Sequence, residues 1–155
     1  MQSLGDAGCN HRTMRRPVYA AESGAGGVER FRRALRVLIV EDEAITAMHI
    51  EDMVLQLGHG VVDSVDTEQA AVKAARRLRP DLVLMDIRLA RGSDGIQAAL
   101  EIRRDPGIRS IFMSAQTDAL TRLRADAAEP FGYLVKPFGM DQIAEAFNCA
   151  SAGGG

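Results

Sequence analysis

The sequence predicts an α/β domain in which a five-stranded parallel sheet is doubly wound, with helices on both faces. Short, almost wholly apolar segments alternate with longer segments whose apolar residues recur at helical spacing, and five such pairs occupy residues 35–150. Strands that read as continuous apolar runs are typical of parallel sheets, because helices bury both of their faces. These two observations set the fold class before any single residue is considered.

The first two strand–helix pairs are bounded by residues that stop helices. Four aliphatic residues in a row predict the strand Arg36–Val40, and apolar residues at helical intervals predict the helix Ala44–Leu57, which Gly58 ends. The next strand, Val61–Val65, is less strongly apolar. The helix Thr67–Leu78 carries alanines and a leucine on one face, and a proline two residues later ends it.

The remaining three pairs repeat the pattern. Their strands are short apolar runs, and their helices place apolar residues every third or fourth position, so that one face is buried. The expected strands are Leu82–Met85, Ser110–Met113 and Gly132–Val135, and the expected helices are Gly95–Arg104, Asp118–Ala127 and Met140–Ala150. Ile143 and Phe147 are the apolar anchors of the last helix.

Both ends of the chain lie outside this pattern. Residues 1–34 are glycine-rich in part and lack an apolar period, so we expect a flexible N-terminal extension before a domain at 35–150, and a flexible C-terminal end at 151–155. Of the 155 residues, 46% are hydrophobic and 26% charged, as in soluble globular domains. No apolar run could span a bilayer and no secretion signal opens the chain, which favours a cytoplasmic protein without membrane insertion.

The distribution of charge argues against a nucleic-acid partner. The chain has 19 basic and 21 acidic residues, and seven arginines but only three acidic residues fall within the first 36, which leaves the domain itself acidic. A nucleic-acid-binding domain usually concentrates basic residues on one face. We therefore expect protein partners.

The residues that follow the first, third, fourth and fifth expected strands combine acidic, hydroxyl and basic groups. Right-handed crossovers bring the carboxyl ends of parallel strands to one edge of the sheet, where such sheets bind ligands. Glu41 and Asp42 follow the first strand, Asp86 the third, Ser114 the fourth and Lys136 the fifth. Three carboxylates, a hydroxyl and an ammonium group should therefore converge from distant parts of the sequence.

These groups suit phosphoryl transfer assisted by a divalent ion. Mg²⁺ takes oxygen ligands, so Asp42 and Asp86 can bind it directly and Glu41 through a water, which relieves the repulsion among the carboxylates. Asp86 can also attack phosphorus to form an aspartyl phosphate. The ion and Lys136 would neutralise charge on the transferred group, and Ser114 can donate a hydrogen bond to it.

Four sequence blocks, VLIVEDE, DLVLMDIRL, FMSA and GYLVKPF, carry a family resemblance. Their order and spacing, with intervals of 44, 28 and 22 residues between Asp42, Asp86, Ser114 and Lys136, resemble the receiver domain of two-component response regulators. The resemblance covers residues 35–150. It implies a flavodoxin-like fold with strand order 2-1-3-4-5.

The resemblance also implies roles for individual residues. Glu41 and Asp42 occupy the acidic-pair positions, Asp86 is the phosphoacceptor, and the main-chain carbonyl of Arg88 completes the protein ligands to Mg²⁺. Three further residues occupy switch or catalytic positions: Ser114 as the switch hydroxyl, Tyr133 as the switch aromatic, and Lys136, joined to Pro137 by a cis peptide, as the lysine of the family.

The loop after Asp86 departs from the family pattern. Ala90 stands where many relatives have proline, and residues 91–95, Arg-Gly-Ser-Asp-Gly, make the loop slightly longer. Within it, Asp94 and Gly95 form a turn signal. These differences concern the conformation of the loop and its partner contacts rather than the chemistry.

We expect a phosphorylation-controlled switch of the stand-alone type, because only a few small residues follow the last helix. A sensor histidine kinase or a histidine phosphotransfer protein would donate the phosphoryl group from a phosphohistidine, with Mg²⁺ as cofactor. The chain would catalyse only its own phosphotransfer and autodephosphorylation. Output would pass to a downstream effector protein through a surface that includes Leu123, Tyr133, Ile143 and Phe147, and a homodimer is kept as an option.

Several alternatives stay open at this point. As a phosphorelay intermediate, the chain would pass the phosphoryl group on to a second histidine; as a receiver-like interaction module, it would take no phosphate. A phosphohydrolase of the haloacid-dehalogenase type would need a second aspartate two residues after the nucleophile, where Arg88 stands. Simpler roles are a helix cap for Asp42 or Glu43 and core packing for Tyr133.

Overall fold

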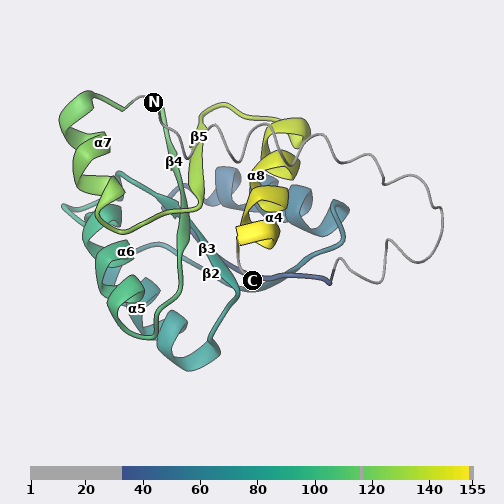
Figure 1. Ribbon diagram of the computed structural model, residues 1–155, viewed down its shortest axis with the longest axis horizontal. Coiled ribbons are helices and arrows are strands. Elements are labelled where there is room, and N and C mark those ends of the chain that lie inside the picture. Colours follow the sequence, from purple (N-terminus) through teal and green to yellow (C-terminus); the bar gives the residue numbers. More distant parts are fainter. Residues whose placement is uncertain (1–32, 116, 154–155) are drawn as a thin grey trace.

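The computed structural model describes residues 33–115 and 117–153. One sheet of parallel strands lies between helices on both of its faces (Figure 1). The strands are β1 (Arg36–Val40), β2 (Gly60–Val65), β3 (Leu82–Asp86), β4 (Ser110–Ser114) and β5 (Gly132–Val135). The helices are α4 (Ala44–Gln56), α5 (Glu68–Leu78), α6 (Gly95–Arg104), α7 (Ala119–Asp126) and α8 (Met140–Gly153).

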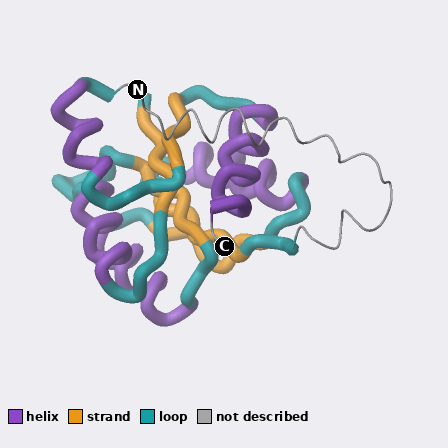
Figure 2. The backbone as a smooth tube through the Cα atoms, in the orientation of Figure 1, coloured by secondary structure: helices purple, strands orange, loops and turns teal. Residues whose placement is uncertain are grey.

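The sheet has the order β2-β1-β3-β4-β5 with all neighbours parallel, which confirms the expected topology. Figure 2 shows the strands as a central twisted layer between the helices. The direction in which the chain adds strands reverses at β1, so a crevice is expected where the carboxyl ends of β1 and β3 lie side by side. The strand ends that carry the polar residues therefore border this crevice.

The sheet separates two apolar cores. Helices α5, α6 and α7 cover one face, and α4 and α8 cover the other. Ile143 and Phe147 are 0% and 2% exposed and pack in the core under α4 and α8. They are anchors of α8, as predicted, but the expectation that they belong to an effector-binding surface is wrong, because their side chains are out of reach of a partner.

Most element boundaries match the prediction to within a residue or two, and a local hydrogen bond explains one of the differences. Thr67 lies outside α5 as its N-cap, since its hydroxyl accepts a hydrogen bond from the Ala70 amide at 3.1 Å. Asp94 caps α6 in the same way, accepting from the amides of Ile96 and Gln97. The turn signal at Asp94 and Gly95 therefore coincides with the start of α6, whose bounds match the expected helix Gly95–Arg104.

The two ends of the chain complete the comparison with the sequence. Helix α8 runs past its predicted end at Ala150 to Gly153, so residues 151–153, expected in a flexible end, are helical. The predicted N-terminal extension lies outside the described residues except for its last two, of which Arg33 pairs with Asp81 at 3.2 Å. None of the helices in the described ranges is long and apolar enough to cross a membrane.

Candidate functional site

The polar residues that follow the strands converge at the carboxyl edge of the sheet. Asp86 is the last residue of β3 and is 5% exposed, and Glu41, directly after β1, is 3% exposed. Ser114 ends β4, and Lys136 follows β5. The apolar strands bury their own side chains, so the first polar residue beyond each strand is left at the same edge.

Three carboxylates form a cluster that could hold a metal ion. Oxygens of Glu41, Asp42 and Asp86 lie within 4.8 Å of one another. Glu41 and Asp86 are buried, whereas Asp42 is open to solvent. Three carboxylates this close repel one another, and their hard oxygen atoms are the ligands that a divalent cation such as Mg²⁺ prefers. The cap interpretation of Asp42 gains no support, because Glu43 is the residue before α4 and makes no side-chain cap.

Lys136 binds two of the three carboxylates at once. Its ammonium donates to Glu41 Oε1 at 2.8 Å and to Asp86 Oδ2 at 3.0 Å. Burial by itself lowers the pKa of Lys136, but the hydrogen bonds to Glu41 and Asp86 outweigh it, and the pKa lies above its usual value. Burial raises the pKa of Glu41 despite the bond from Lys136, and the charge of Asp86 raises it further. Lys136 is therefore a fixed positive charge beside the acid pair.

The backbone holds Asp86 from the other side. The Arg88 amide donates to Asp86 Oδ1 at 3.1 Å, and the peptide bond between Lys136 and Pro137 is cis, as the resemblance implied. Gly95 packs directly against β3: a Cβ atom at this position would lie 1.9 Å from the Asp86 carbonyl oxygen. Any side chain there would force α6 away from the strand, so glycine is required at this contact.

The loop between β3 and α6 also reaches α7. Arg88 and Asp94 form an isolated antiparallel bridge at its base. The Asp94 carboxylate caps α6 with one oxygen and accepts a bond from Arg124 of α7 with the other, at 2.7 Å. Partial burial works against ionisation of Asp94, but Arg124 and the Ile96 amide outweigh it and lower the pKa of the carboxyl. One side chain thus connects the loop to two helices.

Ser114 is engaged by a residue that sequence reasoning missed. Its hydroxyl is hydrogen-bonded to the Thr117 hydroxyl at 2.6 Å. The Ser114 side chain is therefore not free in this state, and it must exchange Thr117 for any new partner. A threonine three residues after a strand carries no recognisable signal by itself, because its contact depends on how the loop turns.

Tyr133 is enclosed by side chains from two other elements. Its ring stacks on Phe112 of β4 with the centroids 5.8 Å apart, and the Arg122 guanidinium lies 3.7 Å over the ring. The phenol hydroxyl donates to Asp126 of α7. Burial and the hydrogen bond to Asp126 both raise the pKa of Tyr133. The ring is half-buried and held by polar groups, so it is more than ordinary core packing.

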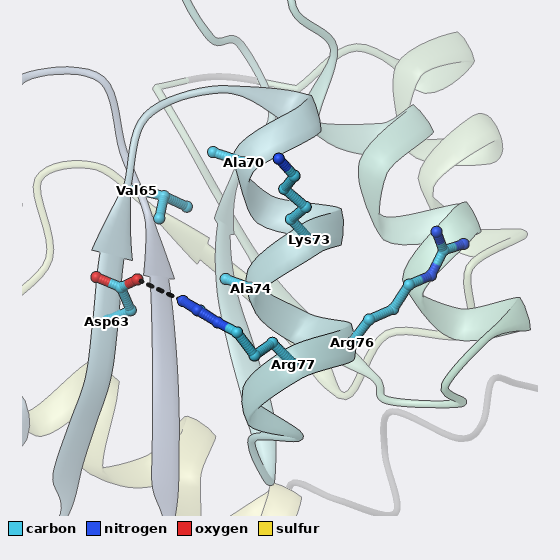
Figure 3. Close-up of a pocket in the computed structure, with 7 residues that line it drawn as sticks. All are labelled: Asp63, Val65, Ala70, Lys73, Ala74, Arg76 and Arg77. Carbon is cyan, nitrogen blue, oxygen red and sulfur yellow. Dashed lines mark ion pairs between the residues drawn. The ribbon is translucent and has the colours of Figure 1, made fainter.

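A hollow of about 650 Å³ lies between β2 and α5 (Figure 3). Its floor includes Val65 and Ala74, and Asp63 pairs with Arg77 across it at 3.9 Å. None of the candidate site residues lines this hollow. The acidic cluster at the strand ends is therefore the candidate functional site.

Comparisons with known proteins agree with this arrangement. A family model described as response regulator receiver domain matches residues 37–148. The chain is 38% identical over 117 residues to the transcriptional regulatory protein PdtaR of Mycobacterium tuberculosis, covering 74% of this chain and 56% of that protein. It is 34% identical over 117 residues to the chemotaxis protein CheY of Thermotoga maritima, covering 75% of this chain and 97% of CheY.

A solved structure shares both the fold and part of the sequence. The signal receiver domain of a modulated diguanylate cyclase from Desulfovibrio desulfuricans G20 superimposes with a TM-score of 0.74 at 33% identity, covering 79% of this chain and 97% of that domain. By contrast, the match to PdtaR spans only about half of that protein's length. The similarity is therefore to one domain.

Proposed function

This chain belongs to the response regulator receiver domain family, and from that premise we propose that it is a signalling switch controlled by phosphorylation of Asp86. The donor is a phosphohistidine on a sensor histidine kinase or on a histidine phosphotransfer protein in the cytoplasm. Output passes to an effector protein by direct contact. The proposal concerns this domain alone.

One observation carries the proposal. Lys136 is hydrogen-bonded to both Glu41 and Asp86, while Asp42 completes a cluster of carboxylate oxygens within 4.8 Å. A purely structural ion pair would need one carboxylate for one ammonium group. The surplus of acidic oxygens suits a divalent cation, and the ammonium group beside Asp86 suits an incoming phosphoryl oxygen.

The residues present fit Mg²⁺. Asp42, Asp86 and the main-chain carbonyl of Arg88 would bind the ion, and Glu41 would reach it through a water. When bound, Mg²⁺ would polarise the phosphoryl oxygens and neutralise part of their charge. Two observations support this set: the proximity of the acidic oxygens, and the burial of Glu41 and Asp86.

In the transfer step, an oxygen of the Asp86 carboxylate attacks the phosphorus atom. The new O–P bond forms as the P–N bond to the donor imidazole breaks, and the electron pair stays on that nitrogen. The Arg88 amide and Lys136 hold the carboxylate during the attack. Lys136 then pairs with an oxygen of the phosphoryl group, which carries about −1.5 to −2 charge.

Phosphorylation of Asp86 would change the hydrogen bonding of Ser114, and this change would alter a nearby surface. Ser114 would release Thr117 and donate to a phosphoryl oxygen, which draws in the loop that leads to α7. Three apolar side chains near this loop are largely exposed, at 66%, 69% and 62%: Leu120, Leu123 and Val135. The proposed output surface consists of these residues together with Tyr133. PdtaR and CheY carry different descriptions, transcription and chemotaxis, so the effector of this chain is left general.

The proposal is tested with radiolabelled acetyl phosphate and Mg²⁺. We expect the natural sequence to acquire label that hydroxylamine releases, as it does from acyl phosphates. Asp86→Asn should remain unlabelled, because the amide is a poor nucleophile. The matched control is Asp52→Asn, since Asp52 is an exposed aspartate on α4.

Two outcomes would contradict the assignment. Label that persists on Asp86→Asn would place the acceptor elsewhere. Label that forms equally well in excess EDTA would show that the reaction does not require a divalent ion. A chase with a histidine phosphotransfer protein then separates the output modes. Rapid loss of label to that protein would indicate a relay, whereas retained label indicates an effector switch.

A further inference from the structure

We propose that Arg122 and Asp126 of α7 form a latch on Tyr133 that holds the chain in its resting state and sets how readily Asp86 loading switches it. The inference rests on the proposed function and adds a regulatory element to it. The Tyr133 latch consists of Arg122, Asp126 and Tyr133. Nothing in the sequence pattern pointed to the two residues of α7.

Three contacts restrain Tyr133, two of them within the latch. Phe112 covers one face of the ring, Arg122 covers another part of it at 3.7 Å, and Asp126 accepts the hydrogen bond of the phenol hydroxyl. Arg122 and Asp126 also pair with each other at 3.8 Å, one helical turn apart. Any rotation of the ring must therefore break contacts to α7.

Helix α7 is held mainly by polar contacts. Ala125 is the only buried residue of this helix, and Arg122, Leu123 and Arg124 are exposed. Burial of one alanine supplies little apolar stabilisation compared with a leucine or isoleucine. The position of α7 relative to β5 therefore depends strongly on the Tyr133 latch. Contacts of this kind are weak enough to be exchanged during signalling.

The start of α7 is connected to the site through a short segment. Ser114 contacts Thr117, and the next residue, Asp118, is the N-cap of α7 and accepts a bond from the Thr121 amide at 2.7 Å. If Ser114 moves toward a group on Asp86, its contact with Thr117 is lost and the N-cap of α7 can shift with the helix. The latch opposes that shift, because Arg122 lies on the same helix and its guanidinium packs on the Tyr133 ring.

The test uses one fluorine label on Tyr133. The chain has two tyrosines, so Tyr19→Phe followed by 3-fluorotyrosine incorporation leaves a single ¹⁹F resonance. Beryllofluoride with Mg²⁺ imitates the phosphoryl group and is titrated while the resonance is followed. In the otherwise natural sequence, we expect the resonance to move between a resting and a loaded position.

Removing the latch should shift this balance. In Arg122→Gln and in Asp126→Asn, the resonance without beryllofluoride should already move toward the loaded position, because fewer contacts hold the resting ring. The apparent affinity for beryllofluoride should rise about fivefold, as expected when a larger fraction of molecules is competent to bind. Tyr133→Phe, which loses only the hydroxyl contact, serves as the second variant and is followed by the amide resonances of α7.

The matched control is Arg104→Gln, which removes an exposed arginine from α6 without touching the latch. It should titrate like the natural sequence. If Arg122→Gln and Asp126→Asn also titrate like Arg104→Gln while the natural sequence responds, the latch is overturned and the proposed function stands. If the natural sequence itself shows no response to beryllofluoride, the proposed function fails and the latch fails with it.

Discussion

Helices α6 and α7 occupy equivalent places in the fold, yet they are held in different ways. Each follows a strand that ends in a site residue, and each begins with an aspartate N-cap, Asp94 or Asp118. Helix α6 buries residues along one whole face: Gly95, Ile96, Ala98, Ala99 and Ile102. Helix α7 buries only Ala125 and relies on ion pairs and a hydrogen bond to Tyr133.

Under the proposed function, this difference separates two tasks around Asp86. The side of the site formed by β3 and α6 must keep Asp86 and the neighbouring carboxylate oxygens in place, and apolar burial does this at little risk of exchange. The side formed by β4 and α7 must change when a group arrives on Asp86. Polar contacts near the surface suit that task, because they can be replaced at small cost.

The strongest test of the fixed side is Gly95→Ala. The new Cβ would overlap the Asp86 carbonyl oxygen, so we expect a loss of about 3 kcal/mol or more in the free energy of unfolding, as for overpacked sites. Phosphorylation should fall with it, since the strand end that carries Asp86 is displaced. Gly132→Ala is the control, because nothing lies within 4 Å of the added atom. Urea unfolding that shows equal stability for both variants would contradict the close docking of α6.

A pair of truncations compares the two helices directly. Ile102→Ala in α6 removes a side chain that is 0% exposed and should cost about 2–4 kcal/mol. Leu123→Ala in α7 removes one that is 69% exposed and should change the free energy of unfolding by about 0.5 kcal/mol or less. Leu123→Ala should instead weaken capture of the effector by the beryllofluoride-loaded protein. Similar losses of stability in both variants would remove the distinction between the helices.

The smallest effect concerns Asp94, the residue that joins the two sides. Its pKa is lowered from the ordinary 3.8, so its charge stabilises the folded state fully above that value and the contribution is lost as the pH falls through the lowered pKa. Asp94→Asn keeps a capping side chain but loses the charge. We expect the free energy of unfolding of the natural sequence to exceed that of Asp94→Asn by about 0.5 kcal/mol at pH 7, since solvent screening weakens the interaction.

The difference should shrink as the pH falls below 3.8 and through the lowered pKa of Asp94, because the carboxyl becomes protonated. Chemical unfolding of both proteins across this range measures it. A constant difference at all pH values would mean that the lost interaction does not depend on the charge of Asp94. Arg124→Gln should show the same trend, since it removes the partner of that charge.

The sheet and the location of the site were predictable because they depend on patterns within single segments. Continuous apolar runs such as Leu82–Met85 identify the buried strands, and parallel topology then forces the strand ends to one edge. The proximity of Asp86 and Lys136, which are 50 residues apart in the sequence, could therefore be predicted. Ile143 shows where this fails: its helical spacing identified an anchor, but spacing alone does not say which face of the helix a partner can reach.

The residues that control α7 were missed for a different reason. Contacts of Thr117 and Asp126 depend on loop conformation and on the distance between neighbouring elements, which no local spacing encodes. Gly95 was predicted as the first residue of a helix, but its close approach to β3 is a tertiary feature that the turn signal does not indicate. Both omissions fall beside the site, where side chains from separate elements meet.

The docking of Gly95 also affects how such a domain can diversify. Gly95 and the buried face of α6 fix this helix against β3. The exposed residues at 90–92 are therefore not needed to hold Asp86 in place. Under the proposed function, exposed side chains there can change to suit another partner while Asp86 keeps its place, within the limit set by the positive φ of Arg91 and Gly92. The loop is thus a suitable place for redesigning the partner contacts of the domain.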